Sequence, residues 1–188
     1  TLALTVQSIF SADLSSITQG IAWLGALCYT LEIYFDFSGY SDMAIGLGKM
    51  LGFNLSENFN YPYLSTSLTD FWRRWHETLN KWFVKYIYIP LGGSKKGKFN
   101  TYKNIGIVFL LTGLWHGSSW SFVFWGLYHG FFVIIERMGL KKIIDKCKYL
   151  NVIYTFIVVL VGWVIFKIPS LHLGLSFIKK MFVPSSIL

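Results

Sequence analysis

Two histidines in this sequence stand where an imidazole could take part in a reaction. His116 lies in the middle of TGLWHGSSW, and His76 ends FWRRWH. Both motifs adjoin segments apolar enough to enter a membrane, where an ionisable residue is costly and is a candidate functional residue. A neutral imidazole, with an unperturbed pKa of about 6.5, is a suitable general base near neutral pH. The alternative for each residue is an imidazole that only packs inside a helix bundle.

The glycines around His116 favour a functional role for it. Gly113 and Gly117 permit close approach of another backbone or of a ligand. His129 lies thirteen residues after His116 and across the break, so the two do not fit one helical face, and we expect His129 to be a hydrogen-bonded packing residue. We expect His172 to lie in a loop. For His76, spacing alone leaves a general base and a packing residue equally open.

Other catalytic arrangements are missing from the sequence. It contains no HExxH zinc motif, no GxSxG elbow, no P-loop and no dinucleotide fingerprint. Cys28 and Cys147 indicate neither a disulfide framework nor a thiolate metal site. The remaining possibility is a reaction in which histidine acts on an activated substrate. Acyl transfer is the simplest reaction of this kind, because it needs no further catalytic group. An imidazole would remove a hydroxyl proton as the oxygen attacks a thioester.

The composition predicts a membrane protein. Of 188 residues, 54% are hydrophobic, 19% aromatic and 14% charged, whereas soluble domains carry about 25% charged residues. The net charge of +8 gathers in two clusters, at 73–103 and 137–148, which flank apolar stretches. Basic residues in such positions mark the cytoplasmic side of membrane proteins. Nucleic-acid binding is disfavoured because no solvated basic face can be drawn.

The first half of the chain reads as a span, an irregular stretch and an amphipathic helix. Residues 17–35 almost meet the requirement for a membrane span, which is about 20 mostly apolar residues. Residues 36–67 are rich in Gly, Ser and Asn, and we expect irregular backbone that is buried or lines a wet cavity. Residues 68–89 return to helical spacing, with rings on one face, and predict an interfacial helix with Trp at headgroup level. Residues 90–93, PLGG, end it.

The second half predicts short helices and one further span. Residues 94–103 read as a basic loop. Residues 104–136 are interrupted near His116, which predicts two short helices with both outer ends in the cytoplasm. Residues 151–168 form another span, and no element is predicted from residue 169 on.

Three motifs together resemble the membrane-bound O-acyltransferase (MBOAT) family. They are FWRRWH, YIPLGG and GLWHGxSW, within a stretch from about residue 32 to 137. The sequence looks most like the bacterial branch that contains alginate and peptidoglycan O-acetyltransferases. The resemblance implies an all-α polytopic membrane protein, with transmembrane, short re-entrant and interfacial helices around a tunnel. Residues 1–188 would be the C-terminal portion of one such domain, without its N-terminal helices.

The resemblance also implies roles for particular residues. His116 would be the catalytic histidine, and His76 would lie deeper toward the donor side. Arg73, Arg74, Trp75 and Trp115 would contact substrate at a cytoplasmic doorway. No metal and no bound cofactor is expected, because the acyl thioester, such as acetyl-coenzyme A, is itself a substrate.

The partners implied are membrane lipid, the thioester donor, and an extracytoplasmic glycan or a partner acetyltransferase protein. The location implied is the bacterial cell (inner or plasma) membrane, crossed several times. The D-alanyl transferase of teichoic acid synthesis, which uses a carrier-protein thioester, is the alternative within the family. A transporter that uses His116 and His129 as proton relays, or a purely structural subunit, represents a different class.

The two adjacent arginines must point in different directions. Successive side chains on a helix project about 100° apart, so Arg73 and Arg74 cannot both point at one phosphate. We expect one to contact the donor and the other to hold the helix through a carboxylate or a lipid.

The charge pattern yields a topology prediction. Cysteines placed singly at Lys96 and Lys142, in a full-length protein freed of its other cysteines, should both face the cytoplasm. They should react with an impermeant thiol reagent only after the cells are opened. Labelling of either position in intact cells would contradict the prediction that both outer ends of 104–136 lie inside.

Overall fold

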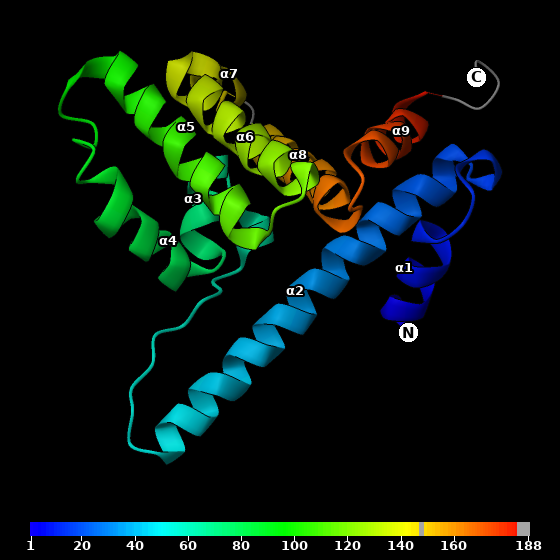
Figure 1. Cartoon of the computed structure of the whole chain (residues 1–188), viewed down its shortest axis with the longest axis horizontal. Helices are drawn as coiled ribbons and strands as arrows, with labels where there is room; N and C mark the ends of the chain where they lie inside the picture. The colour runs from blue at the N-terminus through cyan, green and yellow to red at the C-terminus, as the bar shows by residue number, and fades with distance from the viewer. Residues whose placement is uncertain (147–148, 184–188) are drawn as a thin grey trace.

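The computed structural model describes residues 1–146 and 149–183, in which the regular elements are helices, as predicted. Cys147 lies outside these ranges. Figure 1 shows α5, α6 and α8 side by side, with α3 and α4 next to them and the long α2 crossing past α8. The helices are α1 (Leu2–Phe10), α2 (Gln19–Met50), α3 (Leu68–Arg74), α4 (Glu77–Phe83), α5 (Gly97–His116), α6 (Trp120–Ile135), α7 (Lys141–Ile144), α8 (Leu150–Lys167) and α9 (Leu171–Phe182).

Within the described ranges, α8 alone is long and apolar enough to cross a membrane by length and composition, with a mean hydropathy of 2.1. It coincides with the predicted span 151–168. The 16 residues of α6 rise about 24 Å, which is less than the ~30 Å hydrocarbon core. That length agrees with the prediction of a short arm, whereas the 20 residues of α5 rise about 30 Å, so the prediction is wrong for the first arm. Repeated crossing of the membrane stays a prediction.

Helix α2 is longer than the sequence predicts. It continues to Met50, so the prediction of irregular backbone is wrong for residues 36–50. No proline interrupts the chain before Pro62, and each Gly or Ser costs a helix no more than about 1 kcal/mol. The irregular stretch begins at Leu51 and leads to a single 3₁₀ turn at Pro62–Leu64.

The predicted single helix over the FWRRWH motif is broken at His76. This residue has the left-handed backbone conformation, with φ of 47°, and separates α3 from α4. Two loop residues take the backbone hydrogen bonds of the break: Asn60 N–H donates to Arg74 O at 3.0 Å, and Glu77 N–H donates to Asn58 O at 3.1 Å. The loop therefore replaces the ladder that a continuous helix would have formed.

The apolar face of α3 lies inside the protein. Leu68 and Phe71 are fully buried and Trp75 is 3% exposed. Trp75 packs on Trp163 of α8, with 4.8 Å between ring centroids. These residues fill the core between helices and do not form a lipid-facing surface, and the depth of the helix in the membrane stays a prediction. Trp82 on α4 is half exposed.

Helices α5 and α6 form the predicted antiparallel pair. The break falls at His116 and Gly117, whose φ is 155°, and Ser119 caps α6. A Cβ on Gly126 would overlap the carbonyl oxygen of Phe109 on α5, so the backbones touch. Helix α5 begins at Gly97, so the prediction of a loop over 94–103 is wrong from residue 97 on.

Two short terminal helices were not predicted. Helix α9 packs on α2, where the Trp23 indole N–H donates to Met181 O at 2.7 Å. His172 is exposed in the first turn of α9 rather than in a loop. Helix α1 packs on the first half of α2, where the Ile9 side chain fills the space above Gly25.

The contact between α5 and α6 predicts a position-specific effect of alanine. Gly126→Ala in the full-length protein should lower the thermal unfolding midpoint, because the added methyl group meets backbone and overpacking costs roughly 1–3 kcal/mol. Gly106→Ala is the matched control, since nothing lies within 4 Å of a Cβ there, and it should leave the midpoint unchanged or raise it slightly. Equal midpoints for the two variants would contradict the close contact.

Candidate active site

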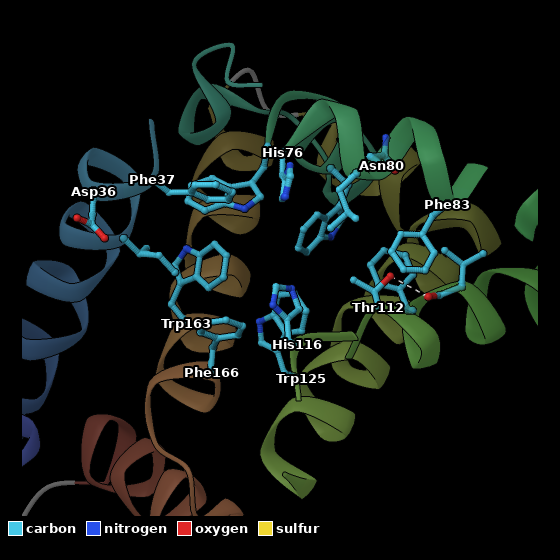
Figure 2. A pocket seen from close by; sticks show the side chains of 16 residues that line it. Asp36, Phe37, His76, Asn80, Phe83, Thr112, His116, Trp125, Trp163 and Phe166 are labelled. Carbon is cyan, nitrogen blue, oxygen red and sulfur yellow. Dashed lines mark hydrogen bonds between the residues drawn. The ribbon is translucent and has the colours of Figure 1, made fainter. Parts of the chain in front are cut away.

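A cavity of about 240 Å³ lies between α2, the α3–α4 break, α5, α6 and α8. Most of its wall is aromatic or aliphatic, and its few polar groups are set among rings. Figure 2 shows His76 and His116 entering it from opposite sides. Its polar lining residues are Asp36, His76, Asn80, Thr112 and His116. An apolar pocket with a few convergent polar groups is the usual form of a small-molecule site.

His116 reaches the cavity because it is the last residue of α5. Aromatic rings hold the imidazole in place: the centroids of Trp125 and Phe166 each lie 5.0 Å from its own. Within the described residues its ring nitrogens make no hydrogen bond, and the ring lines the cavity. The imidazole is therefore oriented by packing and remains open to a ligand.

His76 reaches the same cavity from the break between α3 and α4. Its Nδ1 lies 3.3 Å from Asn58 Oδ1, and Phe37 of α2 packs edge-on against the ring at 4.8 Å. Burial lowers the pKa of His76 from its ordinary value, because desolvation disfavours the charged imidazolium. The ring is accordingly neutral at neutral pH and can accept a proton.

The structure brings together the two histidines that the sequence singled out. They line one cavity although they lie 40 positions apart in the chain. The Trp115 ring contacts both, with centroids 6.3 Å from His76 and 4.9 Å from His116. Trp115 is 57% exposed, whereas Trp75 is almost fully buried and contributes one wall of the cavity.

The two adjacent arginines have different surroundings, as expected. Arg74 Nε lies 3.0 Å from Asp70 Oδ1, four residues earlier on α3, so a carboxylate holds this side chain. Arg73 has no carboxylate partner within the described residues. It lines a second cavity of about 310 Å³ together with Arg137. Neither Arg73 nor Arg74 lines the histidine cavity.

The second cavity adjoins the first. Four residues line both, so only their side chains separate the two spaces, and Arg73 stands on the far side of that wall from His76. The shared residues are Trp72, Asn80, Val108 and Phe109. A long substrate whose charged end rests at the arginines would have a short path to the histidines.

His129 is a packing residue, as expected. It is fully buried between the rings of Trp72 and Trp125, at 5.0 and 5.1 Å. Neither ring nitrogen has a hydrogen-bond partner within the described residues, so the expectation that it is hydrogen-bonded is wrong. It does not line the histidine cavity, which separates it from the candidate catalytic pair.

Sequence reasoning missed Asn58, Asp36, Asn80 and Thr112. Asn58 lies in a stretch that reads only as a turn, and its contact with His76 depends on the break at that residue. Asp36 and Asn80 are single polar residues whose spacing carries no motif. Within the described residues, no group of three or more His, Cys, Asp or Glu side chains could hold a metal ion.

Comparison with known proteins shows which sequences this chain resembles. The chain is 50% identical over 183 residues to the probable alginate O-acetylase AlgI of Pseudomonas putida, which covers 97% of this chain and 37% of that protein. It is 42% identical over 164 residues to the peptidoglycan O-acetyltransferase of Helicobacter pylori, covering 85% and 31%. It is 32% identical over 187 residues to the teichoic acid D-alanyltransferase of Bacillus subtilis, covering 89% and 47%.

The chain thus spans about a third to a half of the length of these curated relatives. The model of the family described as membrane-bound O-acyltransferase matches residues 7–178, which include both histidines, the arginine pair and all helices from α2 to α8. With its two histidines facing one apolar cavity, the chain belongs to the membrane-bound O-acyltransferase family.

Proposed function

We propose that this chain carries the catalytic histidines of a membrane-bound O-acyltransferase that moves an acetyl group from a cytoplasmic thioester to a hydroxyl. The observation that carries the proposal is the shared cavity of His76 and His116 in a member of this family. The acceptor is an extracytoplasmic polysaccharide or a partner acetyltransferase protein. The protein lies in the bacterial cell membrane and crosses it several times. Alginate and peptidoglycan are the polysaccharides named for similar proteins.

His116 acts as the general base. Its imidazole takes the proton of the acceptor hydroxyl as that oxygen attacks the thioester carbonyl. The tetrahedral intermediate collapses by breaking the carbon–sulfur bond, and the thiolate takes up the proton to leave as a thiol. The products are an O-acyl ester and free thiol, so protons and electrons balance without a bound cofactor or metal.

The apolar wall of the cavity supports this chemistry. Rings from α6 and α8 surround His116, and a site of this kind excludes the water that would otherwise hydrolyse the thioester. Exclusion of water also keeps the imidazole neutral, because desolvation disfavours the charged imidazolium. A neutral base near the reacting oxygen is what the first step requires.

The donor meets the protein at the arginine side. Arg73 contacts a phosphate of coenzyme A, a role supported by its lack of a carboxylate partner among the described residues, while Arg74 is held by Asp70. Trp75 lines the histidine cavity, and the Trp115 ring packs against His76 at its edge. An acetyl donor is favoured over D-alanyl because identity to the alginate O-acetylase is 50% and that to the D-alanyltransferase is 32%.

The role of His116 predicts a loss of transfer without a loss of protein. His116→Ala in the full-length protein should reduce transfer of label from acetyl-coenzyme A in purified membranes by roughly 10²–10⁴-fold, as removal of a general base does. Accumulation in the membrane should be unchanged. The matched control is His172→Ala, because His172 is exposed on α9 and should transfer normally.

Two results would overturn parts of this proposal. Normal transfer by a well-expressed His116→Ala protein would remove the assignment of the base. If the wild-type protein transferred no label from acetyl-coenzyme A but did transfer D-alanine from a charged carrier protein, the donor assignment would fail in favour of the D-alanyl alternative. A requirement for sealed vesicles, with no thioester consumed in detergent, would favour a transporter.

The different surroundings of the arginines predict different effects of conservative changes. Arg73→Lys should raise the KM for acetyl-coenzyme A, by roughly tenfold, because an ammonium cannot make the bidentate phosphate contact of a guanidinium. Arg74→Lys should instead lower the yield of folded protein and leave KM unchanged, since it weakens the ion pair between position 74 and Asp70 on α3. Steady-state kinetics and membrane yield measure both effects. The reverse assignment would contradict the placement of Arg73 toward the donor.

A further inference from the structure

One loop oxygen has three polar atoms around it, from α4 and the residue that precedes that helix. Asn58 Oδ1 lies 3.1 Å from Thr78 N, 2.7 Å from Thr78 Oγ1 and 3.3 Å from His76 Nδ1. The other amide atom, Nδ2, donates to Ser41 Oγ of α2 at 3.2 Å. The Asn58 side chain thus links the cavity histidine to the start of α4 and to α2.

The orientation of the Asn58 amide is determined by a backbone group. Thr78 N–H can only donate, so the amide atom facing it must be the carbonyl oxygen and not the NH₂ group. An amide oxygen can only accept hydrogen bonds. The contact with His76 is therefore favourable only when Nδ1 carries the proton.

A proton on Nδ1 of a neutral imidazole leaves a lone pair on Nε2. The remainder of the ring lines the cavity (Figure 2). At 3.3 Å the contact is slightly longer than a typical N–H···O hydrogen bond, and Oδ1 also accepts from Thr78 N and Thr78 Oγ1. The bond to Thr78 and the bond to Ser41 hold Asn58 independently of the histidine.

We propose that Asn58 is a positioning residue that holds His76 as the Nδ1–H tautomer, so that its Nε2 lone pair is presented to the cavity. An entering hydroxyl, thiol or amide N–H can then donate to Nε2. A hydrogen bond to one ring nitrogen of a histidine determines which nitrogen is available for chemistry. The part played in catalysis rests on the proposed function, whereas the tautomer itself does not.

The test uses the full-length protein in detergent, with histidine labelled with ¹³C and ¹⁵N. The His76 signal is identified by its absence from His76→Gln. In the wild type, NMR should report a neutral His76 with Nδ1 protonated. In Asn58→Asp the carboxylate still accepts the same bonds and adds a negative charge, so the pKa of His76 should rise by roughly one unit or more. The acid limb of the transfer rate should move to higher pH by the same amount.

Other charged and titratable groups near His76 are the same in both proteins. They are Asp36 of α2 and His116 of α5 across the cavity, and Glu77, which pairs with Lys81. A shift between the two proteins therefore reports the change at position 58. Asn100→Asp is the matched control, since within the described residues the Asn100 side-chain amide bonds to the Lys96 carbonyl alone, and it should leave the pKa of His76 unchanged.

A double-mutant cycle separates positioning from simple anchoring. Asn58→Ala should reduce transfer about tenfold or more in the wild type but have little further effect in His76→Gln, because it acts through that ring. An Nε2–H tautomer in the wild type, an unmoved pKa in Asn58→Asp, or equal losses in both backgrounds would each overturn the proposal. Loss of both Asn58 variants from the membrane would also overturn it, by showing an anchoring role alone.

These outcomes can be told apart from failure of the proposed function. The NMR measurement needs no turnover. If the protein holds the Nδ1–H tautomer but transfers no acyl group from any thioester, the positioning role of Asn58 stands and the acyltransferase proposal fails. If it transfers normally with a freely exchanging tautomer, the reverse holds.

Discussion

The close backbone contact between α5 and α6 determines where the rest of the site can lie. The carbonyl of Phe109 occupies the place where Gly126 would otherwise carry a side chain, so the two helices run side by side from their basic ends to the turn. The turn then falls at His116 and Gly117. Because α8 packs on α6, the rings of Trp125 and Phe166 close around the imidazole.

Helix α3 completes the cavity from the other side through rings rather than through backbone contact. Trp75 packs on Trp163, and Trp72 packs on Trp125, so α3 is attached to both α6 and α8. Burial of such large rings contributes more than any polar contact in this region. The chain can therefore break immediately after Trp75 without releasing His76 from its place.

The sequence was sufficient to predict the parts of the site that depend on local pattern. His116 could be recognised because an ionisable residue beside two glycines interrupts an apolar run, and α8 because it is a continuous apolar stretch. The division between Arg73 and Arg74 followed from helical geometry alone. Each of these features is determined by residues within one or two turns.

The parts that could not be predicted depend on contacts between distant segments. The break at His76 exists because residues 58–60 supply its backbone hydrogen bonds, and helical periodicity continues through that point. The continuation of α2 past residue 35 could not be predicted, because the residue propensities there are weak. Polar residues favour a loop, whereas the absence of proline permits a helix. Asn58 has no motif at all, since its significance comes from the atoms around it.

The left-handed backbone at His76 sets the stability of the fold against the presence of the imidazole side chain. A residue other than glycine in this conformation raises the energy of the folded chain by roughly 1–3 kcal/mol, although histidine tolerates it better than most residues do. Glycine would relieve the strain and would also remove the imidazole. If the imidazole serves catalysis as proposed, selection for stability and selection for activity oppose each other at this residue, and two nucleotide substitutions in one codon would favour the first over the second.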